Sequence, residues 1–452
     1  MRKRPLLHTS AALAAIFAAF ALSGCEVFPD PEQPGFTYVA GTFQTNPGLF
    51  ITGYSGNMRY VDIPANINGR PVIGIGNPNF SFAIIIGTTV RGAFFNRGIA
   101  SVTIPNSILY IRQGAFNNNA LTAVTIPGNV QIIGNDAFFN NQIKSVTIEY
   151  GVRQIMAGAF GNNKLGDIYL PESVQHLAGF NDNQLTEVQI PTGVTFLDAF
   201  SGNQLTKIYI PPNVSTLGGF GGNYLRTVNI PPSVRRILPD AFSGNLLTDV
   251  TIPNYVTYIG DDAFSNNQLK TINIPPGVEI LRGFAGNQLP TITIPPSVTH
   301  IFPRAFADNN LSTVNIPEGV RDIQNNAFSG NGMTKVTLPS TLTPQLSGFN
   351  NNLLTEIEIP ASVNLIWWEA FRNNLLTEVE IPSNTIVTSC AFDGNPLTKI
   401  TVGENVSFQA AWSFTDPPED TSFEEFFIAS GSRAGTYVRS SAISTDWRLL
   451  EE

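Results

Sequence analysis

Hydrophobic and polar residues follow one short pattern along this chain, and the pattern returns every 20 to 22 residues. Each copy reads approximately N-x-L-x-x-V-x-I-P-x-x-V-x-x-I-x-x-x-A-F, as in "SGNQLTKIYIPPNV" at residues 201–214. The last apolar residue of the V-x-I step falls at Ile104, Ile126, Ile148, Leu170, Ile190, Ile210, Ile230, Ile252, Ile274, Ile294, Ile316, Leu338, Ile359, Ile381 and Val402. Fifteen registrations at this period are typical of a solenoid whose coils stack on one another.

The V-x-I segment of each copy predicts a half-buried β-strand, because apolar and polar residues alternate in it. Stacked coil upon coil, these segments would form one long parallel sheet with strands about 4.8 Å apart. The proline that follows has no N–H and should end the strand. No segment shows an extended 3.6-residue period, so we expect short turns or 3-10 segments on the opposite side. The predicted fold class is a mainly β repeat solenoid of leucine-rich-repeat size, capped at both ends.

Two further columns of the repeat predict how the coils are held together. A phenylalanine ends every copy, and we expect these rings to stack as a buried spine. An asparagine stands three residues after each ring, where its amide could bond backbone groups of its own coil and of the next. We interpret this column as structural, and it comprises Asn119, Asn141, Asn163, Asn183, Asn203, Asn223, Asn245, Asn267, Asn287, Asn309, Asn331, Asn352, Asn374 and Asn395.

The two ends of the chain depart from the repeat. Three basic residues, the apolar run "AALAAIFAAFAL" and "LSGC" indicate a cleaved export signal over residues 1–24. The last four letters resemble the lipobox of bacterial lipoproteins, and that resemblance implies a lipid on Cys25. The expected boundaries are then a signal peptide (1–24), a linker (25–35), an N-terminal cap with an irregular first coil (36–98), the solenoid (99–403) and a C-terminal cap (404–452).

Composition narrows the classes of function. Loss of residues 1–24 would remove three positive charges and no negative ones, which takes the net charge from −9 to −12 and argues against nucleic-acid binding. With Cys25 lipidated, Cys390 has no partner for a disulfide, and we expect it to be a buried inert thiol. The three histidines form no catalytic or metal-binding motif. We therefore predict no enzyme activity, no cofactor and no metal site.

Candidate binding residues are the ones that break the repeat. The position between Val and Ile in each V-x-I segment mostly carries Thr or Asn, and its exceptions are Tyr169, Gln189, Tyr209, Glu358 and Glu380. Lys207, Glu356 and Glu378 stand on the outward column just before the Val and complete the set of candidates. The tyrosines suit an interface, although ordinary sheet packing also explains them. The glutamates could hold a cation such as Ca²⁺ or dock a basic partner, or could form a charge-balanced patch with Lys335 and Lys399.

Trp367 and Trp368 are a second kind of exception, because they replace a glycine and a small residue before "EAF". Two adjacent rings rarely both turn inward. This pair could therefore provide a hydrophobic contact for a partner or for a membrane.

The stretches "LTAVTIPGNVQIIGNDAFFNNQIKSVTIE" and "ITGYSG…VDIPANINGRPV" resemble the BspA-like leucine-rich-repeat family of bacterial surface proteins. The resemblance covers about residues 50–403 and implies a non-enzymatic, lipid-anchored, cell-surface protein for protein binding or adhesion, with a host-matrix protein or another cell as partner. It implies a place on the outer-membrane surface. We expect a monomeric rod that meets the membrane through its lipid alone. A passive envelope spacer and a glycan-binding module are the alternatives.

Overall fold

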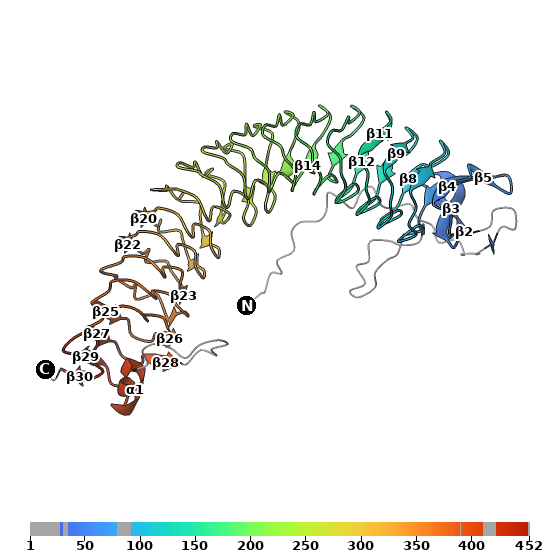
Figure 1. Ribbon diagram of the computed structural model, residues 1–452. Helices are drawn as coiled ribbons and strands as arrows, with labels where there is room; N and C mark the ends of the chain where they lie inside the picture. The colour runs from blue at the N-terminus through green and yellow to red at the C-terminus, as the bar shows by residue number, and fades with distance from the viewer. Residues whose placement is uncertain (1–27, 30–34, 79–91, 389, 410–421, 451–452) are drawn as a thin grey trace. The chain divides into compact units, whose positions relative to one another are not determined.

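The structure, a computed structural model, describes residues 28–29, 35–78, 92–388, 390–409 and 422–450 (Figure 1). They belong to two compact units, residues 1–194 and 195–452. The predicted signal peptide and Cys25 lie outside the described residues. Within each unit the chain winds into short β-coils that stack in parallel, which confirms the predicted fold class.

In residues 1–194 an antiparallel meander leads into the coils. β1 (Phe28–Pro29), β2 (Phe36–Phe43) and β3 (Asn46–Tyr54) pair in that order, and β3 then pairs in parallel with β6 (Arg70–Ile75). The coils of this unit carry strands in two rows. The first row comprises β4 (Tyr60–Asp62), β7 (Ser101–Thr103), β9 (Ala123–Ile126) and β11 (Ser145–Ile148); the second comprises β6, β8 (Tyr110–Ile111), β10 (Ile132–Ile133), β12 (Gln154–Ile155) and β13 (His176–Leu177). β5 (Asn66–Ile67) pairs antiparallel with β6.

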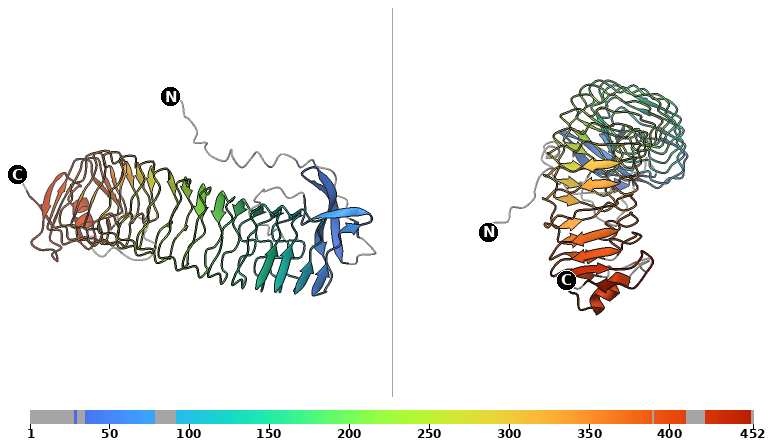
Figure 2. Two further views of the ribbon diagram at one scale, coloured as in Figure 1. Left: turned by 90° about the horizontal axis from the view of Figure 1, so that it is seen from above. Right: turned by 90° about the vertical axis from the view of Figure 1, so that its left-hand side faces the viewer.

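Within residues 195–452 the coils also carry strands in two rows (Figure 2). The second row comprises β14 (Phe196–Asp198), β15 (Thr216–Gly218), β16 (Arg236–Ile237), β17 (Tyr258–Ile259), β18 (Ile280–Leu281), β19 (His300–Ile301), β21 (Asp322–Ile323), β23 (Gln345–Leu346), β24 (Leu365–Ile366), β26 (Ile386–Thr388) and β28 (Ser407–Gln409). The first row comprises β20 (Thr313–Asn315), β22 (Lys335–Thr337), β25 (Glu378–Ile381) and β27 (Lys399–Val402). Helix α1 (Ser422–Ala429), β29 (Gly435–Val438) and β30 (Arg448–Leu449) follow the last coil, and β29 pairs antiparallel with β27.

The position of the main sheet differs from the sequence prediction. We expected one sheet built from the V-x-I segments, which are the first row. The longer ladder is instead the second row, built from the x-I residues that precede the turn to the phenylalanine, and the two rows lie on opposite sides of the coil (Figure 1). The first row is interrupted, and one physical cause is visible at Pro290. The equivalent residues Lys270 and Ser312 donate an N–H to the preceding coil, and proline has none to donate.

The phenylalanine column forms a stacked spine in each unit. Phe94, Phe116 and Phe138 are fully buried, with ring centroids 4.8 and 5.1 Å apart and planes within 10° of parallel. In the second unit, Phe242 and Phe264 stack with a centroid separation of 5.5 Å. Because each ring contributes about 1.5–3 kcal/mol on burial, the spine is a main source of stability.

The asparagine column ties successive coils together through buried hydrogen bonds. Asn141 Nδ2 donates to the carbonyl oxygens of Phe116 and Phe138, both at 3.0 Å, and its Oδ1 accepts the Leu121 N–H at 3.1 Å. The same three contacts recur down the chain, for example at Asn245. One side chain thus satisfies backbone groups of two coils, in a place where water cannot.

A second column that the sequence analysis did not single out stands just before these asparagines. Every residue there has a positive φ: Asn118, Asn140, Asn162, Asp182, Gly202, Gly222, Gly244, Asn266, Gly286, Asp308, Gly330, Asn351, Asn373 and Gly394. Its restriction to Asn, Asp and Gly is the signature of a left-handed backbone and could have predicted the turn. Some of these side chains also form an outer ladder, as when Asn140 Nδ2 donates to Asn118 Oδ1 at 2.6 Å.

Candidate functional site

The predicted tyrosine positions are exposed. In residues 1–194, Tyr169 is 75% exposed and Gln189 is exposed on the next coil. In residues 195–452, Tyr209 is 70% exposed beside the exposed Lys207. The two tyrosines lie in different units, so each supplies an aromatic contact within its own unit. Strong exposure on a column of Thr and Asn leaves most of each ring available to a partner.

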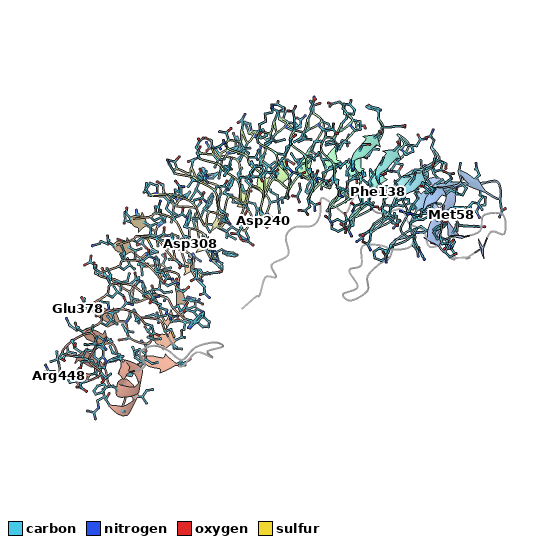
Figure 3. The ribbon with its side chains drawn as sticks, in the orientation of Figure 1. Met58, Phe138, Asp240, Asp308, Glu378 and Arg448 are labelled. Atoms are coloured by element: carbon cyan, nitrogen blue, oxygen red, sulfur yellow. The ribbon has the colours of Figure 1, made fainter. Side chains whose placement is uncertain are left out.

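The glutamate cluster lies on the first row near the end of the second unit, where Glu378 is labelled in Figure 3. Lys335 Nζ donates to Glu356 Oε1 at 2.6 Å, and Lys399 Nζ donates to Glu378 Oε2 at 2.8 Å. The Lys335 hydrogen bond and charge hold the pKa of Glu356 below its usual value, and Glu356 raises the pKa of Lys335. These pairs agree with a charge-balanced patch.

Two members of the cluster remain at the surface on the neighbouring column. Glu358 is exposed, and Glu380 is exposed opposite Thr401 in the pairing of β25 with β27. Within the described part of the chain, no group of three or more His, Cys, Asp or Glu is placed to hold a metal ion. What this arrangement offers is a pair of carboxylates that can accept hydrogen bonds from a basic partner.

Trp367 and Trp368 directly follow β24 and are 37% and 45% exposed. Both rings are therefore partly at the surface. The turn that follows the two tryptophans is held in place at Glu369, which has a φ of 57° and forms an ion pair with Arg372.

The free thiol of Cys390, expected to be buried, is only partly buried near this turn, where it hydrogen-bonds Trp368 and Asp393. Burial, with help from Asp393, raises the pKa of Cys390 to about 12. Such a thiol is a poor nucleophile at neutral pH.

A group of residues on and beside the second row was not among the candidates from the sequence. We name it the Arg–aromatic surface, and its members are Arg235, Arg236, Tyr255, Tyr258, Arg282 and Phe302. The guanidinium carbon of Arg236 lies 4.7 Å from the Tyr258 ring centroid, and that of Arg235 lies 4.9 Å from Tyr255. Arg282 lies between two rings, 4.1 Å from Phe302 and 5.7 Å from Tyr258.

A shallow groove of about 550 Å³ opens on the first row of the second unit, where that row is interrupted. Asp249, Thr251, Asn273 and Thr293 are among the residues that line it. Their hydroxyl, amide and carboxylate groups can exchange hydrogen bonds with a polar ligand. Across the described ranges, no helix is both long and apolar enough to cross a membrane.

The sequence matches the model for BspA type leucine-rich repeat regions over residues 87–199, 178–285, 281–398 and 345–428. Among solved structures, it is similar to a leucine-rich cell surface protein from Faecalibacterium prausnitzii, with 22% identity, 87% of this chain and 96% of that chain covered, and a TM-score of 0.45. It is also similar to a leucine-rich repeat protein from Eubacterium ventriosum, with 19% identity, coverage of 82% and 95%, and a TM-score of 0.41. No curated protein matches the sequence.

Proteins of this repeat family are generally non-enzymatic scaffolds for protein interaction. The family match extends over residues 87–428, well over half of the chain. Within the matched residues, the repeated phenylalanines and asparagines of this chain build the stacked coils described above. The chain therefore belongs to the BspA-type leucine-rich-repeat family.

Proposed function

We propose that this chain is a protein-binding scaffold displayed on a bacterial cell surface and held there by a lipid on Cys25. One observation carries the proposal: Tyr169 and Tyr209 are strongly exposed on an outward column that mostly holds Thr and Asn. Aromatic side chains are enriched at protein interfaces, and a scaffold that only separates two layers does not need them.

The expected boundaries belong to the same proposal. Residues 1–24 would be removed as a signal peptide, 25–35 would link the lipid to the folded chain, 36–98 and 404–452 would cap the ends, and 99–403 would present the binding columns. The meander of β1 to β3 before the first coils supports the N-terminal cap, and the pairing of β29 with β27 supports the C-terminal one. The chain would act as a monomer on the outer-membrane surface.

The partner would be a protein of the host matrix or of a neighbouring cell. Tyr169 and Gln189 would contact it from the first unit, and Lys207 and Tyr209 from the second. The Glu356, Glu358, Glu378 and Glu380 cluster and the Trp367–Trp368 pair would add charged and apolar contacts. All of these residues project from a backbone that the asparagine column fixes.

The anchor and the display are tested on intact cells. Metabolic labelling with a palmitate analogue should mark the chain, and Cys25→Ser should lose the label and release the protein. Protease added outside the cells should digest the anchored chain while a periplasmic marker stays intact. A labelled chain that outside protease cannot reach would refute surface display, and an unlabelled one would refute the lipid anchor.

Binding is tested by pull-down with matrix proteins and with surface extracts of neighbouring cells. Saturable capture that falls at least about tenfold with Tyr209→Ala, but not with Thr227→Ala on the same row, would support the proposal. Capture that both variants retain equally would refute the role of Tyr209, and no capture by any preparation would favour the passive spacer.

Glycan binding is a second candidate, favoured by the groove that includes Thr251 and Asn273. In that case Thr251→Ala and Asn273→Ala would abolish the signal on a glycan array. An array on which the unsubstituted chain gives no signal would rule it out.

A further inference from the structure

We propose that the Arg–aromatic surface binds an acidic, partly apolar segment of a protein partner. This inference rests on the proposed function and names the chemistry of the partner. The surface lies wholly in residues 195–452, on the second row of strands and the residues beside it, which the sequence analysis did not associate with binding.

The stacking of the arginines determines which of their groups face a ligand. Arg236 stands directly across from Tyr258 in the pairing of β16 with β17, and its guanidinium lies over that ring at 4.7 Å. A guanidinium that stacks by its flat face keeps its N–H edge for hydrogen bonds in the plane. Carboxylates fit this edge through two parallel hydrogen bonds, so Arg236 offers a preformed carboxylate site.

Arg282 supports the surface from beneath and is not a second carboxylate site, because its charge is already paired with Asp261. Its side chain is only 14% exposed, packs against Phe302 and Tyr258, and pairs with Asp261 at 2.9 Å. The neighbouring rings fix its orientation, so little side-chain entropy remains to be lost on binding.

The same stacking argues against a neutral sugar as the ligand. Sugars pack on open aromatic faces, and here arginines already lie over Tyr255, Tyr258 and Phe302. The groups left to the ligand are guanidinium N–H donors, chiefly those of Arg236, because Arg235 Nη1 already donates to the carbonyl oxygens of Pro232 at 2.8 Å and Val234 at 3.2 Å. Such donors attract anions.

Charge complementarity points the same way and sets the extent of the site. The chain as a whole has a net charge of −9, and the coils that carry the three arginines also carry Asp240, Asp261, Asp262 and Glu279. The attraction for an acidic partner therefore comes from Arg235 and Arg236 themselves and not from a positive net charge of these coils. An acidic corner adjoins these arginines. Asp240, labelled in Figure 3, has a pKa raised by burial and by the nearby Asp262 and Asp261. An acidic partner would be attracted to Arg235 and Arg236 and repelled by this corner, which fixes its direction across the row.

Half-buried apolar side chains beside the arginines favour a peptide over an anionic polysaccharide. Leu238, Ile280 and Phe302 are each partly exposed on the second row. A peptide can place apolar side chains on these residues while its carboxylates meet the guanidinium edges. Arginine and aromatic residues around a partly apolar centre are also the usual composition of protein-binding hot spots.

The experiment is a selection from a random peptide library displayed on phage, with the full detergent-solubilised chain as bait. We expect the selected peptides to be enriched in Asp and Glu next to apolar residues. A synthetic copy of the best peptide should bind Arg235→Ala/Arg236→Ala at least about tenfold more weakly. Arg236→Lys should also weaken binding, because lysine keeps the charge but loses the planar fork.

Arg226→Ala is the matched control, since Arg226 is an exposed arginine on the first row. Its affinity for the peptide should equal that of the unsubstituted chain. Selected peptides without acidic enrichment, or with equal affinity for the double variant, would overturn the proposal. Tighter arginine-dependent binding of a sulfated polysaccharide would also overturn it, because the partner would then not be a protein. A pull-down that captures a protein equally well with the double variant would refute this inference and leave the proposed function standing.

Discussion

Replacing Asn245 with alanine should destabilise the second unit by about 3 kcal/mol, because three buried backbone groups would lose their partner at once. Asn245 Nδ2 donates to the carbonyl oxygens of Phe220 at 2.9 Å and of Phe242 at 3.1 Å, and Oδ1 accepts the Leu225 N–H at 3.0 Å. Each such bond contributes about 1 kcal/mol net, and each buried group left without a partner costs about 1–3 kcal/mol. A water molecule in the space left by the Asn245 side chain would hydrogen-bond some of these groups and reduce the loss of stability. We therefore expect a value near the lower limit for three groups, about 3 kcal/mol.

The loss should be local, because each coil of a solenoid contacts only its neighbours. Hydrogen exchange followed by mass spectrometry is therefore the sharpest assay. Peptides covering residues 220–247 should exchange about a hundredfold faster, since 1.4 kcal/mol corresponds to a factor of ten. Peptides from residues 360–400 should keep their rates.

Asn229→Ala is the matched control, because Asn229 is an exposed asparagine on the first row of the same unit. A surface change of this kind should shift stability by less than about 0.5 kcal/mol. If Asn245→Ala were as mild as Asn229→Ala, the buried asparagines would not hold the coils together and the account of the column would be wrong.

Three further predictions concern backbone conformation, pH and thiol reactivity. Asn266 has a φ of 55°, so Asn266→Val should destabilise the fold by about 1–2 kcal/mol in urea denaturation while Asn266→Gly stays near neutral. Burial raises the pKa of Asp198 to about 6, so the folded state favours its protonated form. The contribution of Asp198 to the free energy of unfolding should be greatest below about pH 4 and should be lost as the pH rises through about 6. In urea titrations, Asp198→Asn should remove this pH dependence and raise the free energy of unfolding by about 3 kcal/mol at pH 7. Cys390, with its pKa raised to about 12, should react slowly with iodoacetamide at pH 8 in the folded chain and faster after unfolding in urea, and equal rates would contradict the raised pKa.

The architecture could be predicted from sequence because the same physical requirements return in every coil. Few other residues can replace the stacked Phe ring or the buried Asn amide of a coil. The repeat period is therefore visible directly in the amino-acid sequence. The location of the longer sheet was harder to predict. The V-x-I segment shows the clearer alternation of apolar and polar residues. A β-ladder, however, also needs N–H donors in register. A proline such as Pro290 interrupts the ladder without changing the alternation. The x-I segments are only two or three residues long, too short for their alternation to stand out.

The candidate site was less predictable, because neighbours across a sheet are set by three-dimensional register. Arg236 and Tyr258 lie 22 positions apart in the sequence and become adjacent only when the second row is recognised as a ladder. Arg282 and Phe302 are 20 positions apart, because their coil is two residues shorter. A search of the sequence at one fixed spacing would therefore miss one of the two pairs. The tyrosines and glutamates of the first row could be proposed because their column was followed coil by coil.

Within each coil the repeated, buried residues hold the scaffold together and the exposed ones can contact a partner. Binding residues should therefore be sought outside the repeated motif. A change at Asn245 or Phe242 affects two stacking interfaces, so it alters the scaffold whatever the ligand. A change at an exposed position such as Arg236 affects few neighbours and leaves the coil intact. Residues on the outward columns can therefore change with the partner at little loss of stability, while the inward ones cannot. In this chain, Arg235 and Arg236 can be replaced without disturbing the coil, so they can change with the partner. The aromatic rings that they stack on hold them in a fixed geometry, which favours affinity.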